Sequence, residues 1–267
     1  MAVTRIFALC GLLLALAGCL PPRPAPVAET PPAVREIAGV LLGETVLAGE
    51  ILLAGDVLVP RGSTLIIRPG TVVHIRTSES TKIDPEYLSP ATEILIRGTL
   101  RCEGSEDAPI RFEAGPPPAG ETIAWAGIIF AGGSGSVAWS SIAAAESGIL
   151  CIAAAPELHH NTIEGCRYGI VAQKGSAPQI LDNVLSGGEG GIFCWLGSQP
   201  TLRRNRIVDH AEEGIFVDAG SRPWLDRNEV RGNAIGLALF SGDLPFDATG
   251  IVDNGENVRF LGGGGGQ

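Results

Sequence analysis

The chain has few basic and few aromatic residues, and it contains a single methionine. Nineteen Lys and Arg stand against 29 Asp and Glu, which gives a formal net charge of −10 at pH 7. No cluster of Lys and Arg interrupts this acidic balance, so we expect no nucleic-acid partner. Glycine, in contrast, is abundant, with 37 residues. This composition is typical of a β-rich chain with many turns.

The N-terminus has the pattern of an export signal. Arg5 precedes an apolar run from Ile6 to Leu16, which is too short to span a bilayer comfortably and ends in small residues. The sequence Leu16-Ala17-Gly18-Cys19 resembles the lipobox of bacterial lipoproteins, in which the cysteine is lipidated and becomes the first mature residue. This resemblance implies a signal peptide over residues 1–18 and a lipid on Cys19. An ordinary secretory signal that is cut nearby is the alternative.

The segment after Cys19 predicts a tether. Residues 20–32 hold six prolines and show no hydrophobic period, which favours a stiff extended segment over 19–33. Leu20 stands where, in enterobacterial sorting, an aspartate retains lipoproteins at the inner membrane. By that resemblance we expect a lipid-anchored protein of the cell envelope, at the outer membrane. Removal of Arg5 with the signal changes the formal charge from −10 to −11.

Four asparagines recur at nearly constant spacing in the second half of the chain. They are Asn161, Asn183, Asn205 and Asn228, separated by 22, 22 and 23 residues. A proline precedes each asparagine by five residues, and a glycine followed by Ile or Leu comes eight or nine residues after it. A period of this length with β-type patterning indicates a solenoid, because each unit is too small to bury its own apolar face and must stack on its neighbours.

Each repeat contains three short apolar pieces, which predict three strands per turn of a triangular coil. Like residues then stack on like residues inside the coil. The three inward columns are Leu158/Ile180/Leu202/Leu225, Ile163/Leu185/Ile207/Val230 and Ile170/Ile192/Ile215/Leu237. The asparagines lie at a bend between strands, where Asn tolerates a left-handed backbone and its amides can bond from coil to coil as a ladder.

The repeats resemble those of right-handed parallel β-helix proteins of the pectate-lyase-like superfamily. Earlier segments, such as 55–60 and 125–130, resemble the opening coils of bacterial surface proteins of this kind. The resemblance implies an all-β fold, a right-handed single-stranded parallel β-helix of about ten rungs over residues 34–261. The remaining boundaries that we expect are a cap at 34–43, loops at 76–93 and 114–123, and a flexible glycine tail at 262–267.

The cysteines have no CxxC spacing, so a zinc site is not expected. Cys151 and Cys194 fall on matching inward positions two coils apart, about 9–10 Å, which is too far for a disulfide. We therefore predict both as buried thiols. The sequence leaves the state of Cys102 and Cys166 open.

A candidate binding face follows from the outward positions of the strand that begins with the Gly-Ile pair. In enzymes of the resembled superfamily the substrate groove usually lies along this strand. Aromatic rings offer flat apolar surfaces to sugars, and polar neighbours can bond hydroxyl groups. The outward columns are Leu150/Val171/Phe193/Phe216/Ala238 and Ile152/Gln173/Trp195/Asp218/Phe240. From these we select as binding residues Gln173, Phe193, Trp195, Phe216, Asp218 and Phe240.

Two other interpretations of this face, coverage by another segment and catalysis, also have to be considered. A long apolar strip can also be covered by a loop such as 76–93, or by a partner subunit. Catalysis of the resembled kinds needs several aspartates, or a calcium cluster with a base, and the outward columns supply only Asp218, near the 209–213 bend. We therefore expect no catalytic residue and no cofactor. We expect no metal either, since the pair His159-His160 has only Asp182 within one coil.

These features predict a non-enzymatic, lipid-anchored β-helix that presents one long face to a polysaccharide or an envelope protein. Two alternatives remain open at this point. One is a polysaccharide lyase or hydrolase that uses Asp218 with the 209–213 bend. The other is a structural spacer without a ligand.

Overall fold

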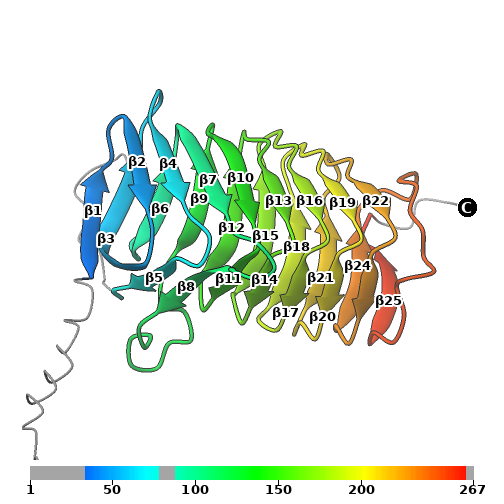
Figure 1. Cartoon of the computed structure of the whole chain (residues 1–267). Helices are drawn as coiled ribbons and strands as arrows, with labels where there is room; N and C mark the ends of the chain where they lie inside the picture. The colour runs from blue at the N-terminus through cyan, green and yellow to red at the C-terminus, as the bar shows by residue number, and fades with distance from the viewer. Residues whose placement is uncertain (1–33, 78–87, 263–267) are drawn as a thin grey trace, which may run out of the picture. The chain divides into compact units, whose positions relative to one another are not determined.

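A computed structural model describes residues 34–77 and 88–262. The described residues belong to one compact unit. Its strands wind into a parallel solenoid, coil upon coil (Figure 1). Among the described residues, no helix is long and apolar enough to span a membrane. The expected signal peptide, the tether with Cys19, and the tail after Gly262 lie outside the described residues.

Most coils contribute a strand to each of three faces, which the chain visits in order. Face 1 consists of β6 (Glu93–Ile96), β9 (Gly127–Ala131), β12 (Ser147–Ile152), β15 (Tyr168–Gln173), β18 (Gly190–Cys194), β21 (Glu213–Val217), β24 (Ile235–Leu239) and β25 (Glu256–Phe260). Face 2 consists of β2 (Glu44–Leu47), β4 (Thr64–Ile67), β7 (Thr99–Glu103), β10 (Ser134–Ala138), β13 (Glu157–His159), β16 (Gln179–Leu181), β19 (Thr201–Arg203) and β22 (Trp224–Asp226). Face 3 consists of β5 (Val72–Ile75), β8 (Ile110–Ala114), β11 (Ser140–Ala143), β14 (Thr162–Glu164), β17 (Val184–Ser186), β20 (Arg206–Val208) and β23 (Glu229–Arg231).

The first two coils have longer strands, each of which runs along faces 3 and 1. They are β3 (Glu50–Val59) and β1 (Arg35–Val40), and β1 pairs in parallel with β3 at the end of the sheet. The expected cap at 34–43 therefore contains an end strand of the solenoid. Along face 1, ten residues pair one above the next: Val40, Leu58, Leu95, Ile129, Leu150, Val171, Phe193, Phe216, Ala238 and Arg259. The predicted right-handed parallel β-helix of about ten rungs is confirmed.

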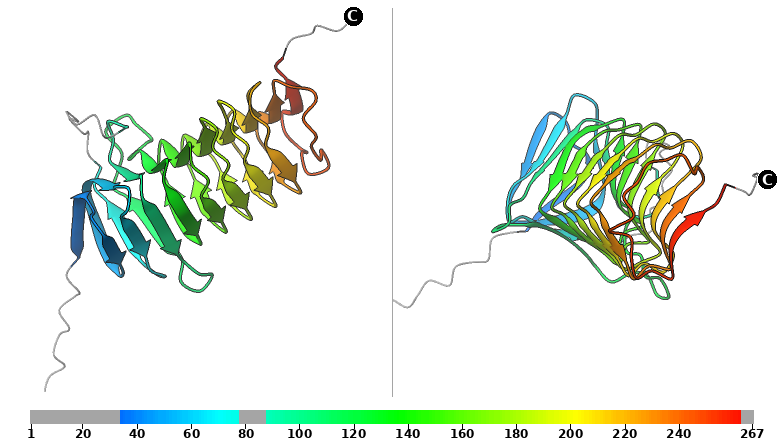
Figure 2. Two further views of the ribbon diagram at one scale, coloured as in Figure 1. Left: turned by 90° about the horizontal axis from the view of Figure 1, so that it is seen from above. Right: turned by 90° about the vertical axis from the view of Figure 1, so that its right-hand side faces the viewer.

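The interior is formed by the three predicted columns, and their register is the one expected. Leu158 pairs with Ile180, Ile163 with Leu185, and Ile170 with Ile192, and each column continues through the later coils. Nearly all of these side chains are fully buried. Viewed from the C-terminal end, successive coils have a similar outline and follow one another along the solenoid (Figure 2). This stacking fills the core at every coil.

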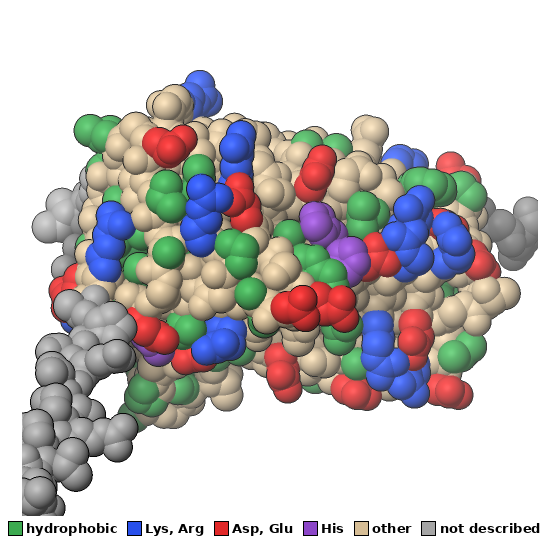
Figure 3. All heavy atoms as spheres, viewed as in Figure 1, with side chains coloured by type: hydrophobic (Ala, Val, Ile, Leu, Met, Phe, Trp, Pro, Cys, Tyr) green, Lys and Arg blue, Asp and Glu red, His purple; other side chains and the backbone are tan. Residues whose placement is uncertain are grey.

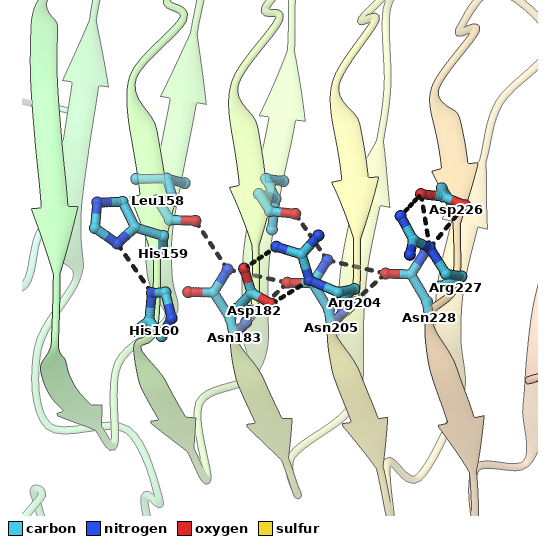
Figure 4. A network of polar contacts seen from close by, with 11 residues as sticks. Leu158, His159, His160, Asp182, Asn183, Arg204, Asn205, Asp226, Arg227 and Asn228 are labelled. Carbon is cyan, nitrogen blue, oxygen red and sulfur yellow. Dashed lines mark hydrogen bonds and ion pairs between the residues drawn. The ribbon is translucent and has the colours of Figure 1, made fainter. Parts of the chain in front are cut away.

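The asparagines form a continuous ladder at the turn between faces 2 and 3 (Figure 4). The side-chain amide of Asn183 donates to the Leu158 carbonyl at 2.9 Å and to Asn205 Oδ1 at 3.0 Å. Asn183 Oδ1 in turn accepts from the backbone and side-chain nitrogens of Asn161, at 3.0 and 2.9 Å. The residue before each asparagine, Asp182 for example, has a positive φ. The ladder therefore satisfies the buried polar groups of a tight left-handed turn.

Two further polar ladders, which the spacing of the repeats did not predict, line the other turns. Between faces 1 and 2, the backbone nitrogen of Ser198 donates to the Ser221 hydroxyl, and that of Ala154 to the Ser176 hydroxyl. Between faces 3 and 1, the backbone nitrogen of His210 donates to Asn233 Oδ1, and the carboxamide of Asn233 donates to Asn254 Oδ1. Polar side chains thus stabilise all three corners of the coil.

The recurring glycines of face 1 are required by close packing. A Cβ atom at Gly191 would lie 2.5 Å from Ile207 Cγ2 and 2.3 Å from the Gly214 carbonyl oxygen. Gly169 and Gly214 have equally short contacts to the face 3 column. Only glycine lets the backbone approach the core so closely. This explains why each repeat carries a glycine just before its face 1 isoleucine or leucine.

All four cysteines of the described chain are free thiols in the core. Cys151 and Cys194 are buried as predicted, and Cys102 and Cys166, which the sequence left open, are buried too. Burial raises the pKa of the Cys166 thiol to about 11 and raises those of the other three further. They act as small hydrophobic side chains.

Candidate functional site

Five aromatic rings from successive coils meet on the outer side of face 1. We call Tyr168, Phe193, Trp195, Phe216 and Phe240 the aromatic strip. Phe193 and Phe216 stack at 5.4 Å between ring centroids, and Trp195 lies nearly perpendicular to both, at 5.4 and 5.9 Å. Tyr168 contacts Phe193 at 4.8 Å, and Phe240 extends the strip beyond Phe216 at 6.0 Å. The aromatic rings of the two predicted outward columns therefore lie in contact with one another.

Phe193 has a different position in the strip from the one expected. It is 4% exposed, because Tyr168, Trp195 and Phe216 surround its ring. A Cβ atom at Gly190 would lie 2.1 Å from Phe193 Cε2, so the glycine makes room for the ring. Phe193 is thus the packed centre of the strip rather than a contact surface. The surface consists of Trp195, Phe216 and Tyr168, which are partly exposed, and Phe240, which is 40% exposed.

Tyr168 belongs to the strip but was missed, because strict alternation along the strand places it inside. The pleat breaks at Gly169, which faces inward next to Ile170, toward the core residue Leu185. This break turns Tyr168 outward to contact Phe193 and Trp195. The only sequence signal for it is an aromatic residue directly before the repeated glycine.

The N-terminal half of the same outer face is covered by a loop. Leu88, Pro90 and Ile123 form the walls of a groove of about 420 Å³ whose floor includes Ile129 and Leu150. The Glu93 carboxylate fixes this loop by accepting from the backbone nitrogens of residues 88 and 89, both at 2.9 Å. The loop that we considered as a cover for the strip therefore packs, in its described part, over the coils before it.

The Asp218 carboxylate stabilises the turn in which it lies and the corresponding turn of the coil before it. Its carboxylate accepts hydrogen bonds from the backbone nitrogens of Leu196 at 2.7 Å, Ser221 at 2.8 Å and Gly220 at 3.0 Å. Burial raises the pKa of Asp218, but the hydrogen bonds from Ser221, Leu196 and Gly220 outweigh it and hold the pKa below its usual range. Asp218 is therefore an ionised turn-stabilising residue. Gln173, in the same outward column, is partly exposed.

A row of charged residues runs along one edge of the strip. Arg167 forms ion pairs with Glu146 at 2.7 Å and with Glu189 at 3.4 Å. Glu212 follows Glu189 on the next coil, where its backbone nitrogen donates to the Glu189 carbonyl oxygen at 2.8 Å. The edge therefore begins with alternating charges and continues with two acidic residues, Glu189 and Glu212, on neighbouring coils.

His159 and His160 lie at the corner between β13 on face 2 and β14 on face 3, beside the asparagine ladder (Figure 4). Figure 3 shows histidine side chains gathered with acidic and basic ones on the face of the molecule that is seen in Figure 1. His160 stacks on Trp139 at 4.4 Å, and its Nδ1 lies 3.1 Å from His159 Nδ1. The next coil supplies Asp182, whose carboxylate is held by Arg204 at 2.5 Å. In the described ranges, no group of three or more His, Cys, Asp and Glu side chains is placed to hold a metal ion. The corner is a surface ladder of rings and ion pairs, and such exposed pairs each contribute little.

Comparison with known proteins agrees with the coil geometry. A family model described as right handed beta helix region matches residues 121–259, more than half of the chain. The chain belongs to this family. A search of curated proteins and a search of solved structures each found no match. The family defines the architecture, and it hosts functions that depend on the site each member carries.

Proposed function

We propose that the aromatic strip is a glycan-binding face on a lipid-anchored protein of the bacterial envelope. The observation that carries the proposal is the contact of five rings over four successive coils, with Trp195, Phe216 and Phe240 open to solvent in part. Coils are about 4.8 Å apart, so the strip is long enough for an extended oligosaccharide. Sugar rings pack their C–H faces on aromatic rings, and buried ring area contributes about 25 cal/mol per Å².

A binding role fits this face better than a catalytic one. The enzyme alternative depends on Asp218, and three backbone nitrogens already occupy that carboxylate. The hydrogen bonds also lower its pKa, which makes it a poor proton donor near neutral pH. His210, in the adjacent bend, is 3% exposed and points into the coil rather than toward a ligand.

The envelope location rests on the lipobox resemblance at Cys19. Replacement Cys19→Ser in the full chain should abolish palmitate labelling and leave the protein soluble or uncleaved. Labelling that persists in this variant would contradict the anchor.

The binding role is tested by a screen of the mature chain against envelope and plant polysaccharides. We expect retention of at least one polysaccharide without release of shorter products. A chain that retains none would support a spacer. Products released from a polymer, with their loss in Asp218→Asn, would support the enzyme alternative.

A further inference from the structure

The acidic edge of the aromatic strip differs from the rest of the charged surface. On the other faces, several residues on neighbouring coils carry opposite charges, as in the pairs Asp182–Arg204 and Arg206–Glu229, both at 2.5 Å. At the edge of the strip, Glu189 is followed on the next coil by Glu212 and then by Glu213 at the start of β21. Within residues 34–77 and 88–262, neither Glu212 nor Glu213 forms an ion pair.

These carboxylates and the rings form one surface. Glu189 directly precedes Gly190, which pairs with Tyr168 of the coil before, and Glu213 lies three residues before Phe216 on β21. Burial raises the pKa of Tyr168, and the charges of Glu189 and Glu212 raise it further. Burial also raises the pKa of Glu213, with the charge of Glu212 adding to it and that of Arg259 offsetting a part. Like charges on neighbouring strands repel each other, and a cation that lies between them would relieve this repulsion.

We propose that the strip takes a glycan that carries free amino groups, such as a β-linked glucosamine polymer; this rests on the proposed glycan-binding function. An ammonium group would form charge-assisted hydrogen bonds with Glu212 and Glu213. It would also be attracted to the faces of Trp195 and Tyr168, while the sugar rings pack along the strip. Polyuronates would place their carboxylates against this acidic edge and be repelled. The strip would therefore bind amino-bearing polymers in preference to polyuronates.

The test compares three oligomers of equal length on the mature chain by calorimetry: glucosamine, N-acetylglucosamine and galacturonate hexamers. We expect the glucosamine oligomer to bind at least about tenfold more tightly than its neutral N-acetyl counterpart, and the galacturonate oligomer not to bind. The double variant Glu212→Gln/Glu213→Gln should reduce this ratio to within about twofold. Glu157→Gln, an exposed acid of β13 on face 2, is the matched control and should leave the ratio unchanged.

The outcomes separate this inference from the function on which it rests. Equal affinity for the glucosamine and N-acetyl oligomers, with both weakened by Trp195→Ala, would overturn the amine preference and keep the glycan-binding face. An amine preference that survives in the double variant, or that survives unchanged in Trp195→Ala, would show general attraction to an acidic protein and overturn the inference. Binding of none of the oligomers, nor of any polysaccharide in the screen, would overturn both.

Discussion

Removal of one asparagine from the middle of the ladder should destabilise the solenoid strongly. In Asn183→Ala, four hydrogen bonds disappear: two donated by the carboxamide, to the Leu158 carbonyl and Asn205 Oδ1, and two accepted from Asn161. All of these residues are buried, so the lost bonds are not replaced by bulk water, although Asn205 Oδ1 keeps its bond from the Asn183 backbone nitrogen and the Asn161 carboxamide keeps its bond to the Val137 carbonyl. At about 1 kcal/mol net per bond, with allowance for non-additivity, we expect a loss of about 2–4 kcal/mol in the free energy of unfolding.

The end of the ladder provides the internal comparison. Asn228 accepts two bonds from Asn205 and donates one to the Leu202 carbonyl, which makes three bonds in place of four. It is also slightly more exposed than the others. Asn228→Ala should therefore cost less than Asn183→Ala or Asn205→Ala.

The assay is urea unfolding of the mature chain, followed by far-ultraviolet circular dichroism. The slope of the free energy against urea must be compared between variants, because a solenoid can lose its all-or-none unfolding. Losses below about 0.5 kcal/mol at all three positions would refute the argument that a buried ladder stabilises this turn.

Three further predictions follow from the core and the turns. Burial lowers the pKa of His210 below its ordinary value of 6.5, and the carbonyls of Gly187 and Leu185 offset part of this shift. The unfolded chain therefore binds a proton at this residue before the folded chain does, and the free energy of unfolding should fall as the pH drops below about 6.5, by up to about 1.4 kcal/mol per pH unit. The pKa of His159 is lowered too, so this residue adds to the slope. His210→Asn, which copies Asn233 on the next coil, should flatten the His210 part of this dependence in urea titrations at several pH values, and an unchanged slope would contradict the assignment. Gly190→Ala should cost about 1–3 kcal/mol in thermal unfolding because the new methyl group meets the Phe193 ring, and a neutral result would show that the ring is free to move. The buried thiols should react with a thiol reagent only after unfolding, so rapid labelling of the native chain would contradict their burial.

The sequence predicted the coil well because the inward columns repeat. Leu158, Ile163 and Ile170 each recur as an aliphatic residue one period later, so register and burial follow from spacing alone. The asparagine ladder was predictable for the same reason. The ladder between faces 3 and 1 was not, because His210 occupies the position of Asn233 on its coil and hides the repetition.

The candidate site was predictable only in part, because its properties depend on neighbours rather than on period. The alternation of inward and outward residues correctly predicted that Phe193 faces outward, yet three surrounding rings bury it. The Asp218 carboxylate could accept hydrogen bonds from a ligand, but it already accepts them from the backbone nitrogens of Gly220 and Ser221 in its own turn. The outward position of Tyr168 arises from a break in the pleat at Gly169, which no alternation rule contains.

The central claim is that the aromatic strip binds a glycan, and calorimetric titration of Trp195→Ala tests it most directly. Trp224, which lies on face 2 and is 56% exposed, provides the matched control, since Trp224→Ala removes the same side chain from another surface. With the tightest oligosaccharide from the polysaccharide screen, we expect Trp195→Ala to raise Kd at least about tenfold, or about 1.4 kcal/mol, and Trp224→Ala to leave Kd unchanged. Equal Kd values for the wild-type chain and Trp195→Ala, with both proteins folded, would contradict the claim.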